Sequence, residues 1–109
     1  MDRTTDYLIE IQKYVQYIRT KIKIDKIVLF GSYAKGTAAE DSDIDLAVVS
    51  PDFGKSPLHE KMDLFGWRHY SSLTADLQPF PFSPEQFEAD HFFVEEIRKT
   101  GIDITDQVL

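Results

Sequence analysis

The chain has 109 residues, 42% of them apolar, with 19 acidic against 12 basic side chains and a net charge of −7. This size fits one domain over residues 1–109 with a single core, and the acidic balance lacks the field that drives sequence-independent nucleic-acid binding. The absence of cysteine excludes disulfides and thiolate metal sites. No apolar run approaches the ~20 residues that span a bilayer, and the polar first residues have no signal-peptide pattern. We therefore expect a cytoplasmic protein without a nucleic-acid or membrane partner.

The N-terminal stretch predicts an amphipathic helix over residues 5–23. Residues 26–30, with the sequence KIVLF, then predict the first strand. The tyrosines beside the helix stripe, Tyr7, Tyr14 and Tyr17, favour partly buried packing rather than ligand binding. The apolar residues of the stripe recur at spacings of three and four: Leu8, Ile11, Val15, Ile18 and Ile22.

A glycine and a serine follow the first strand directly. Gly31 lets the backbone approach a phosphate closely, and Ser32 adds a hydroxyl donor. Residues 32–35 predict a short helical turn that ends at Gly36. Lys35, one turn beyond Ser32, either reaches a triphosphate as a point charge or is a solvated surface lysine.

Two aspartates open the next apolar run, which predicts a strand over residues 44–49, antiparallel to the first strand. Period-two alternation puts Asp43 and Asp45 on one face, with Cα atoms roughly 6.5 Å apart. Clustered carboxylates repel by roughly 4 kcal/mol at 4 Å, so the pair favours a divalent cation, and all-oxygen ligation indicates Mg²⁺ or Mn²⁺. The alternative is a pair of strands whose solvent-facing positions carry Asp without function.

The order Ser56-Pro57 predicts the start of a second helix over about residues 57–70. We expect one apolar face on it, with Leu64 and Trp67 widening that face or facing a partner. The three histidines lack metal-ligand spacing, so structural or surface roles are favoured for them. The expected face consists of Leu58, Met62, Phe65 and His69.

Residues 73–78 predict a third strand in which Asp76 lies on the polar face. Asp76 is either a plain outward-facing residue or, beside the second strand, a third carboxylate that converges on Asp43 and Asp45. Residues 79–82, PFPF, predict an apolar connector, because proline lacks the N–H that an interior strand needs.

A capping box predicts the start of the last helix. Ser83 takes the N-cap position and Gln86 follows three residues later. We expect this helix to run to about residue 100 and residues 102–104 to add a short edge strand.

Together these residues resemble the minimal nucleotidyltransferase family, within the polymerase-beta-like nucleotidyltransferase superfamily. The hallmark of that family is Gly-Ser, ten residues, then Asp-x-Asp, and Gly31, Ser32, Asp43 and Asp45 match it position for position. The resemblance implies an α/β (α+β) nucleotidyltransferase fold, with a small mixed sheet of three to four strands flanked by helices. It also maps the third carboxylate of the family onto Asp76.

The resemblance implies transfer of a nucleoside monophosphate from ATP or another NTP to a hydroxyl group. Two Mg²⁺ ions, or Mn²⁺, would be held by Asp43, Asp45 and Asp76. Gly31 and Ser32 would hold the outer phosphates.

Three functions then remain open. Small stand-alone members of the family often act as antitoxins that attach AMP to a helical HEPN-type ribonuclease toxin. Others modify small molecules, although those enzymes carry an additional helical domain. The third possibility is a catalytically silent module that neutralises its partner by contact alone, which the intact motif argues against.

Overall fold

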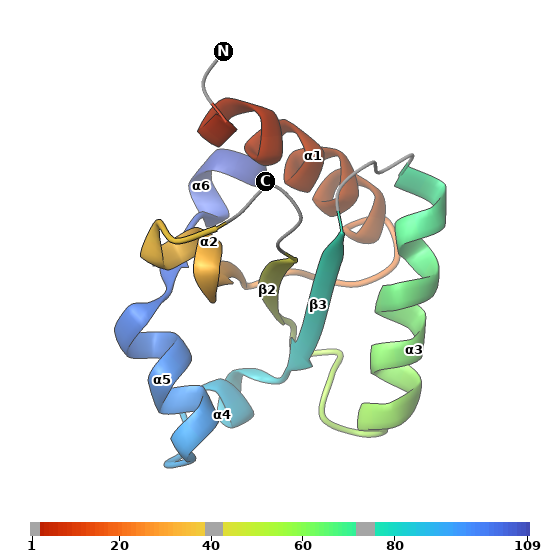
Figure 1. Ribbon diagram of the computed structural model, residues 1–109. Helices are drawn as coiled ribbons and strands as arrows, with labels where there is room; N and C mark the ends of the chain where they lie inside the picture. Colours follow the sequence, from red (N-terminus) through yellow and green to blue (C-terminus); the bar gives the residue numbers. More distant parts are fainter. Residues whose placement is uncertain (1–2, 39–42, 72–75) are drawn as a thin grey trace.

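The computed structural model describes residues 3–38, 43–71 and 76–109 (Figure 1). Its strands form one four-stranded sheet with helices around it. No helix in these three stretches has both the length and the apolar character needed to cross a membrane. The elements are α1 (Arg3–Ile18), β1 (Lys26–Phe30), α2 (Ser32–Lys35), β2 (Ile44–Val49), α3 (Pro57–Trp67), the 3₁₀ helix η1 (Arg68–Ser71), β3 (Leu77–Phe82), α4 (Pro84–Phe87), α5 (Phe92–Thr100), β4 (Ile102–Asp103) and α6 (Thr105–Val108).

The sheet is mixed, as predicted, with the strand order β3-β2-β1-β4. β1 pairs antiparallel with both β2 and β4, whereas β2 pairs parallel with β3. The bounds of β1, α2 and β2, the antiparallel pairing of β1 with β2 and the short strand after α5 confirm the sequence predictions. The register sets Phe30 opposite Asp45, so the end of β1 and the start of β2 lie at the same end of the sheet.

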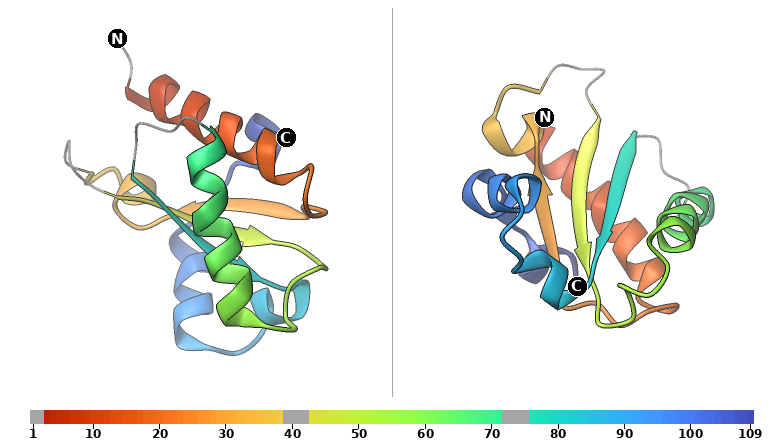
Figure 2. Two further views of the ribbon diagram at one scale, coloured as in Figure 1. Left: turned by 90° about the vertical axis from the view of Figure 1, so that its right-hand side faces the viewer. Right: turned by 90° about the horizontal axis from the view of Figure 1, so that it is seen from below.

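Helices cover both faces of the sheet. In the left-hand view of Figure 2, α1 lies above the sheet, α4 and α5 lie below it, and α3 runs across its edge beside β3. Because side chains alternate along a strand, each of the central strands contributes to two separate cores. The strand residues of the core under α1, α3 and α6 are Ile27, Leu29, Ile44, Leu46, Val48 and Leu77. Those on the α4 and α5 side are Val28, Phe30, Ala47, Val49 and Phe82.

The first helix is shorter than predicted. α1 ends at Ile18 rather than near residue 23, and turns follow it, with Ile22 N donating to Ile18 O (3.0 Å). Ile11, Val15 and Ile18 of the predicted stripe are buried, whereas Leu8 and Ile22 are half-buried. Tyr14 is fully buried instead of lying half exposed. The Tyr14 hydroxyl donates to Leu64 O at 2.7 Å, which joins α1 to α3 and satisfies the buried hydroxyl. Burial raises the pKa of Tyr14 well above its ordinary value.

The predicted third strand is displaced. Residues 73–75 lie outside the described residues, and β3 runs from Leu77 to Phe82, through the segment predicted as a connector. Ile44 N donates to Asp76 O (2.7 Å) and Ser50 N to Phe82 O (2.9 Å), so the even-numbered residues of this segment face β2. The missing N–H groups of Pro79 and Pro81 would therefore point away from the sheet. An edge strand tolerates proline at such positions.

The buried face of α3 also differs from the prediction. The helix ends at Trp67 and continues as η1, but Leu58 and Met62 are exposed whereas Leu64 is fully buried. Two polar side chains of this region bond to backbone groups: Glu60 accepts from N–H groups of the loop just before the helix, and Arg68 Nη1 in η1 donates to Leu77 O at 2.7 Å. The spacing of the apolar residues alone therefore predicted the wrong buried side for α3.

The last predicted helix is broken in two. The capping box is present, with Gln86 N donating to Ser83 Oγ (3.1 Å) and Ser83 N donating to Gln86 Oε1 (2.8 Å). However, α4 ends at Phe87, and α5 begins only at Phe92. Arg98 Nη1 on α5 donates to Phe87 O, so a long-range bond replaces the helical continuation that the sequence suggested.

Candidate active site

The turn after β1 and the first carboxylate of β2 are in direct contact. Gly31 adopts φ 72° and ψ −151°, a conformation that residues with a Cβ avoid. A Cβ at this position would also overlap Oδ2 of Asp45. Glycine is therefore required twice here, by its backbone angles and by the closeness of the carboxylate.

Asp45 is the partly buried member of the aspartate pair. It alternates with Ala47 and Val49, so its side chain lies on the α5 face of the sheet, while Asp43, just before β2, is exposed. Burial raises the pKa of the Asp45 carboxyl, and repulsion from Asp43 raises it further. The ionised pair is thus electrostatically disfavoured, and a bound cation would relieve the penalty.

Asp76 lies at the same end of the sheet. Its backbone carbonyl accepts from Ile44 N (2.7 Å), which places it beside the start of β2, and its side chain is exposed. Within residues 3–38, 43–71 and 76–109, no three acidic or histidine side chains gather as one metal-binding group. The backbone pairing thus brings Asp76 near Asp43 and Asp45, whereas the three carboxylates do not close on one point. Mutual repulsion opposes such closure for exposed anions.

A cavity of about 230 Å³ opens beside Asp45. Two of the residues that line it, Gly31 and Lys35, were predicted to contact the nucleotide. Ser32 begins α2 and is half-buried beside them. A lysine ammonium and a serine hydroxyl thus lie at the same end of the sheet as the Asp45 carboxylate.

The far wall of this cavity comes from α5, a helix that no sequence motif connects with the site. Glu96 and Thr100 contribute polar groups, and Phe93 and Ile97 contribute apolar ones. These residues recur at spacings of three and four, so they share one side of the helix. That spacing marks a helix face, but only the tertiary packing shows that it faces Asp45.

The chain matches the family model for the nucleotidyltransferase domain over residues 11–104. A relative from Methanocaldococcus jannaschii, named "Putative protein adenylyltransferase MJ0141", is 29% identical over 84 residues, 77% of this chain and 82% of the relative. A crystal structure of a toxin–antitoxin with AMP-PNP has 25% identity and a TM-score of 0.63, over 86% of this chain and 71% of the other.

The fold has a second structural counterpart. A crystal structure described as a "putative nucleotidyltransferase" from Sulfolobus solfataricus superposes with a TM-score of 0.64, over 89% of this chain and 78% of the other, at 16% identity. The fold class predicted from the motif is thereby confirmed. The chain belongs to the nucleotidyltransferase domain family and is an enzyme of that class, as the Gly-Ser and Asp-x-Asp motif predicted.

Proposed function

We propose that this nucleotidyltransferase transfers AMP from ATP to a hydroxyl group of a partner protein, in a reaction that depends on Mg²⁺. The observation that carries the proposal is the contact between Gly31 and the Asp45 carboxylate at the mouth of a cavity that also contains Lys35. This contact joins a candidate phosphate-binding turn to a candidate metal ligand. Transfer of a phosphoryl-linked group requires both at one place.

The donor set fits a hard divalent cation. Asp43 and Asp45 offer carboxylate oxygens, and the burial and repulsion that disfavour ionised Asp45 would be offset by a positive ion. Asp76 is the third proposed ligand, with side-chain rotation bringing its exposed carboxylate toward the pair. Two Mg²⁺ ions, or Mn²⁺ in their place, would neutralise the charge that develops on the phosphates.

The remaining site residues are proposed to orient the nucleotide. The backbone at Gly31 and the hydroxyl of Ser32 would hold the β- and γ-phosphates, and the Lys35 ammonium would approach them as a point charge. In the reaction, the acceptor oxygen forms a bond to the α-phosphorus while the bond from that phosphorus to the bridging oxygen of the β-phosphate breaks. Pyrophosphate leaves with that oxygen. Asp76 is proposed to lie nearest the acceptor and to take the hydroxyl proton.

The acceptor is proposed to be a helical HEPN-type toxin, which this chain silences as its antitoxin in the cytoplasm. The name of the M. jannaschii relative and the toxin–antitoxin structure with AMP-PNP support a protein acceptor. Trp67 and Phe82 pack in or against the two cores, whereas Phe92 and Phe93 are exposed on α5, the helix that lines the cavity beside Asp45. Exposed aromatic side chains favour an interface there.

The test is the intact mass of the protein encoded next to this chain, co-expressed with the wild type or with Asp43→Asn. We expect an adenylyl mass increment on the neighbour with the wild type alone, since the variant lacks one metal-ligating carboxylate. An unmodified neighbour in both cases, together with modification of a free small molecule by the wild type, would assign the enzyme to the small-molecule class instead. A neighbour that is silenced without modification would identify a binding module.

A further inference from the structure

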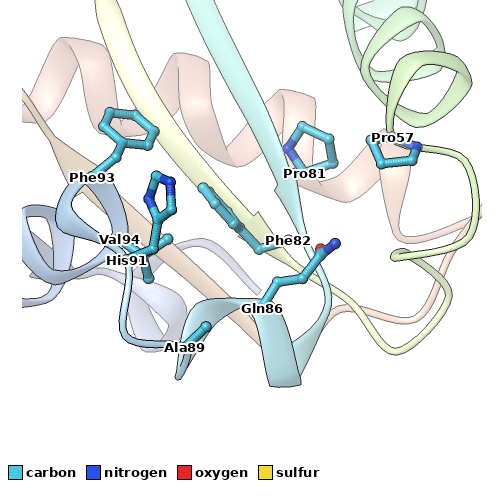
Figure 3. Close-up of a pocket in the computed structure, with 8 residues that line it drawn as sticks. All are labelled: Pro57, Pro81, Phe82, Gln86, Ala89, His91, Phe93 and Val94. Atoms are coloured by element: carbon cyan, nitrogen blue, oxygen red, sulfur yellow. The ribbon is translucent and has the colours of Figure 1, made fainter.

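A second cavity, of about 300 Å³, lies on the same face of the sheet as Asp45. Figure 3 shows Phe93 and His91 on one side of it, Pro57 and Pro81 on the other, and Phe82 between them. Three of its eight lining side chains are flat aromatic rings, those of Phe82, His91 and Phe93. Rings of this kind suit a planar apolar ligand better than an extended, flexible one.

Phe93 connects this cavity to the active site, because it lines both the second cavity and the one that contains Asp45. Its ring is held in an aromatic cluster with Phe30 and Phe80. The centroid of the Phe93 ring lies 5.9 Å from the ring centroid of Phe30 and 5.9 Å from that of Phe80, and both contacts are edge-to-face. Even so, 41% of Phe93 is exposed. The cluster therefore fixes the ring while part of its surface stays free for a ligand.

We infer that the second cavity binds the purine base of the nucleotide, stacked on Phe93. This inference rests on the proposed function, since it requires the triphosphate to lie beside Asp45. One side chain, Phe93, lies between the two cavities, just as one ribose lies between a base and its phosphates. Base-aromatic stacking supplies affinity through the π-face.

Gln86 provides a polar group at the edge of this cavity. Its Oε1 accepts from Ser83 N at 2.8 Å, so the capping box fixes the orientation of the carboxamide. That arrangement leaves the Gln86 NH₂ group as a donor. The ring nitrogens of a purine accept hydrogen bonds, so the Gln86 NH₂ group can donate to the edge of a base that stacks on Phe93.

The test separates the base from the phosphates. With Mg²⁺ present, ATP and inorganic tripolyphosphate are titrated calorimetrically into the wild type and into Phe93→Ala, Phe93→Trp and Phe92→Ala. Phe92 is the matched control, because it is the neighbouring phenylalanine, is 82% exposed and does not line either cavity. We expect Phe93→Ala to weaken ATP binding roughly 10-fold without changing the affinity for tripolyphosphate. Phe93→Trp keeps a stacking surface and should retain ATP affinity, as should Phe92→Ala.

Each other outcome overturns the inference in a recognisable way. Equal losses for ATP and tripolyphosphate in Phe93→Ala would make Phe93 a support of the phosphate site rather than a base-binding residue. Unchanged ATP affinity with loss of partner modification would assign the cavity to the acceptor polypeptide. If the wild type binds neither ligand in a Mg²⁺-dependent manner, the proposed function itself fails. A wild type that binds ATP, while Phe93→Ala binds it equally well, refutes the base site alone.

Discussion

The carboxylate of Asp45 and the backbone of Gly31 act as one structural unit. The turn at Gly31 cannot accept a side chain, because the Asp45 carboxylate occupies the space that a Cβ would need. Both residues were singled out from the sequence, since glycine and aspartate at this spacing indicate the chemistry. Their direct contact depends on the pairing of Phe30 with Asp45 across two strands. No local pattern reports that pairing.

Replacing Gly31 with alanine should abolish Mg²⁺-dependent ATP binding and lower the free energy of unfolding. The new Cβ is strained at positive φ and also displaces Asp45. Gly36→Ala is the control, because Gly36 has a similar φ of 74° with open space around it. It should cost about 1–2 kcal/mol of stability and spare ATP binding. Urea denaturation and calorimetry check both variants, and equal ATP binding by the two would contradict the proposed role of the contact.

Replacing Asp45 with asparagine should stabilise the free protein at neutral pH. Burial and repulsion from Asp43 raise the pKa of Asp45 above its ordinary value, so the folded protein holds this proton more tightly than the unfolded chain. The resulting stability is present at low pH and is lost as the pH rises through the folded pKa. The advantage of Asp45→Asn should therefore shrink as urea denaturations move from pH 7 toward pH 4. Asp63→Asn, at an exposed position on α3, serves as the control. A variant less stable than the wild type at pH 7 would refute the prediction.

At the scale of elements, the sequence predicted what local patterns determine. β1, β2, the α2 turn and the Ser83 capping box all depend on residues next to one another, and the structure contains each of them. β3 was misplaced because a proline-containing run reads as a connector until its place at the sheet edge is known. The break between α4 and α5 likewise depends on Arg98, eleven residues from the carbonyl that it binds.

The prediction of the buried face of α3 was wrong for a different reason. Glu60 on α3 and Arg68 just after it form hydrogen bonds with backbone groups, while Leu58 and Met62 are exposed and Leu64 is buried. The spacing of apolar residues along the helix cannot reveal this, because the elements packed against a helix decide which of its sides is buried. The same limit explains why the sequence does not identify Glu96 and Thr100 as part of the cavity beside Asp45. Nothing on their own helix distinguishes them from solvent-facing residues.

Glu60 should contribute to stability in a pH-dependent way. Burial alone would raise its pKa, but hydrogen bonds from the N–H groups of Gly54, Ser56 and Lys55, together with the Lys55 charge, lower it below 4.5 overall. The stability is therefore present above the unfolded pKa and lost as the pH falls through the folded one. Glu60→Gln should lower the unfolding midpoint at pH 7, and the gap to wild type should narrow in acid. Thermal denaturation from neutral to acidic pH tests this prediction, with the exposed Glu85→Gln variant as the control. A difference in unfolding midpoint between Glu60→Gln and the wild type that stays constant with pH would contradict it.

At the scale of the whole molecule, nucleotide and metal should stabilise the fold together. A ligand that binds only the folded state raises its stability by mass action. With Mg²⁺ and ATP in excess, we expect the melting temperature to rise by about 5 °C, which corresponds to roughly 1 kcal/mol for a domain of this size. ATP with EDTA should have little effect, and Asp43→Asn combined with Asp45→Asn should remove the metal-dependent rise. Equal shifts under all conditions would exclude a metal-assisted site.

The edge strand β3 limits how this molecule can associate. Pro79 and Pro81 remove two of its outward-facing donors, Arg68 occupies the carbonyl of Leu77, and α3 crosses the same edge (Figure 2). An incoming strand would find no continuous row of backbone groups to pair with. Asp43, Asp45 and Asp76 lie at the end of the sheet where β2 and β3 begin. A protein that docks at this edge must therefore be recognised through side chains and shape rather than by adding a strand to the sheet.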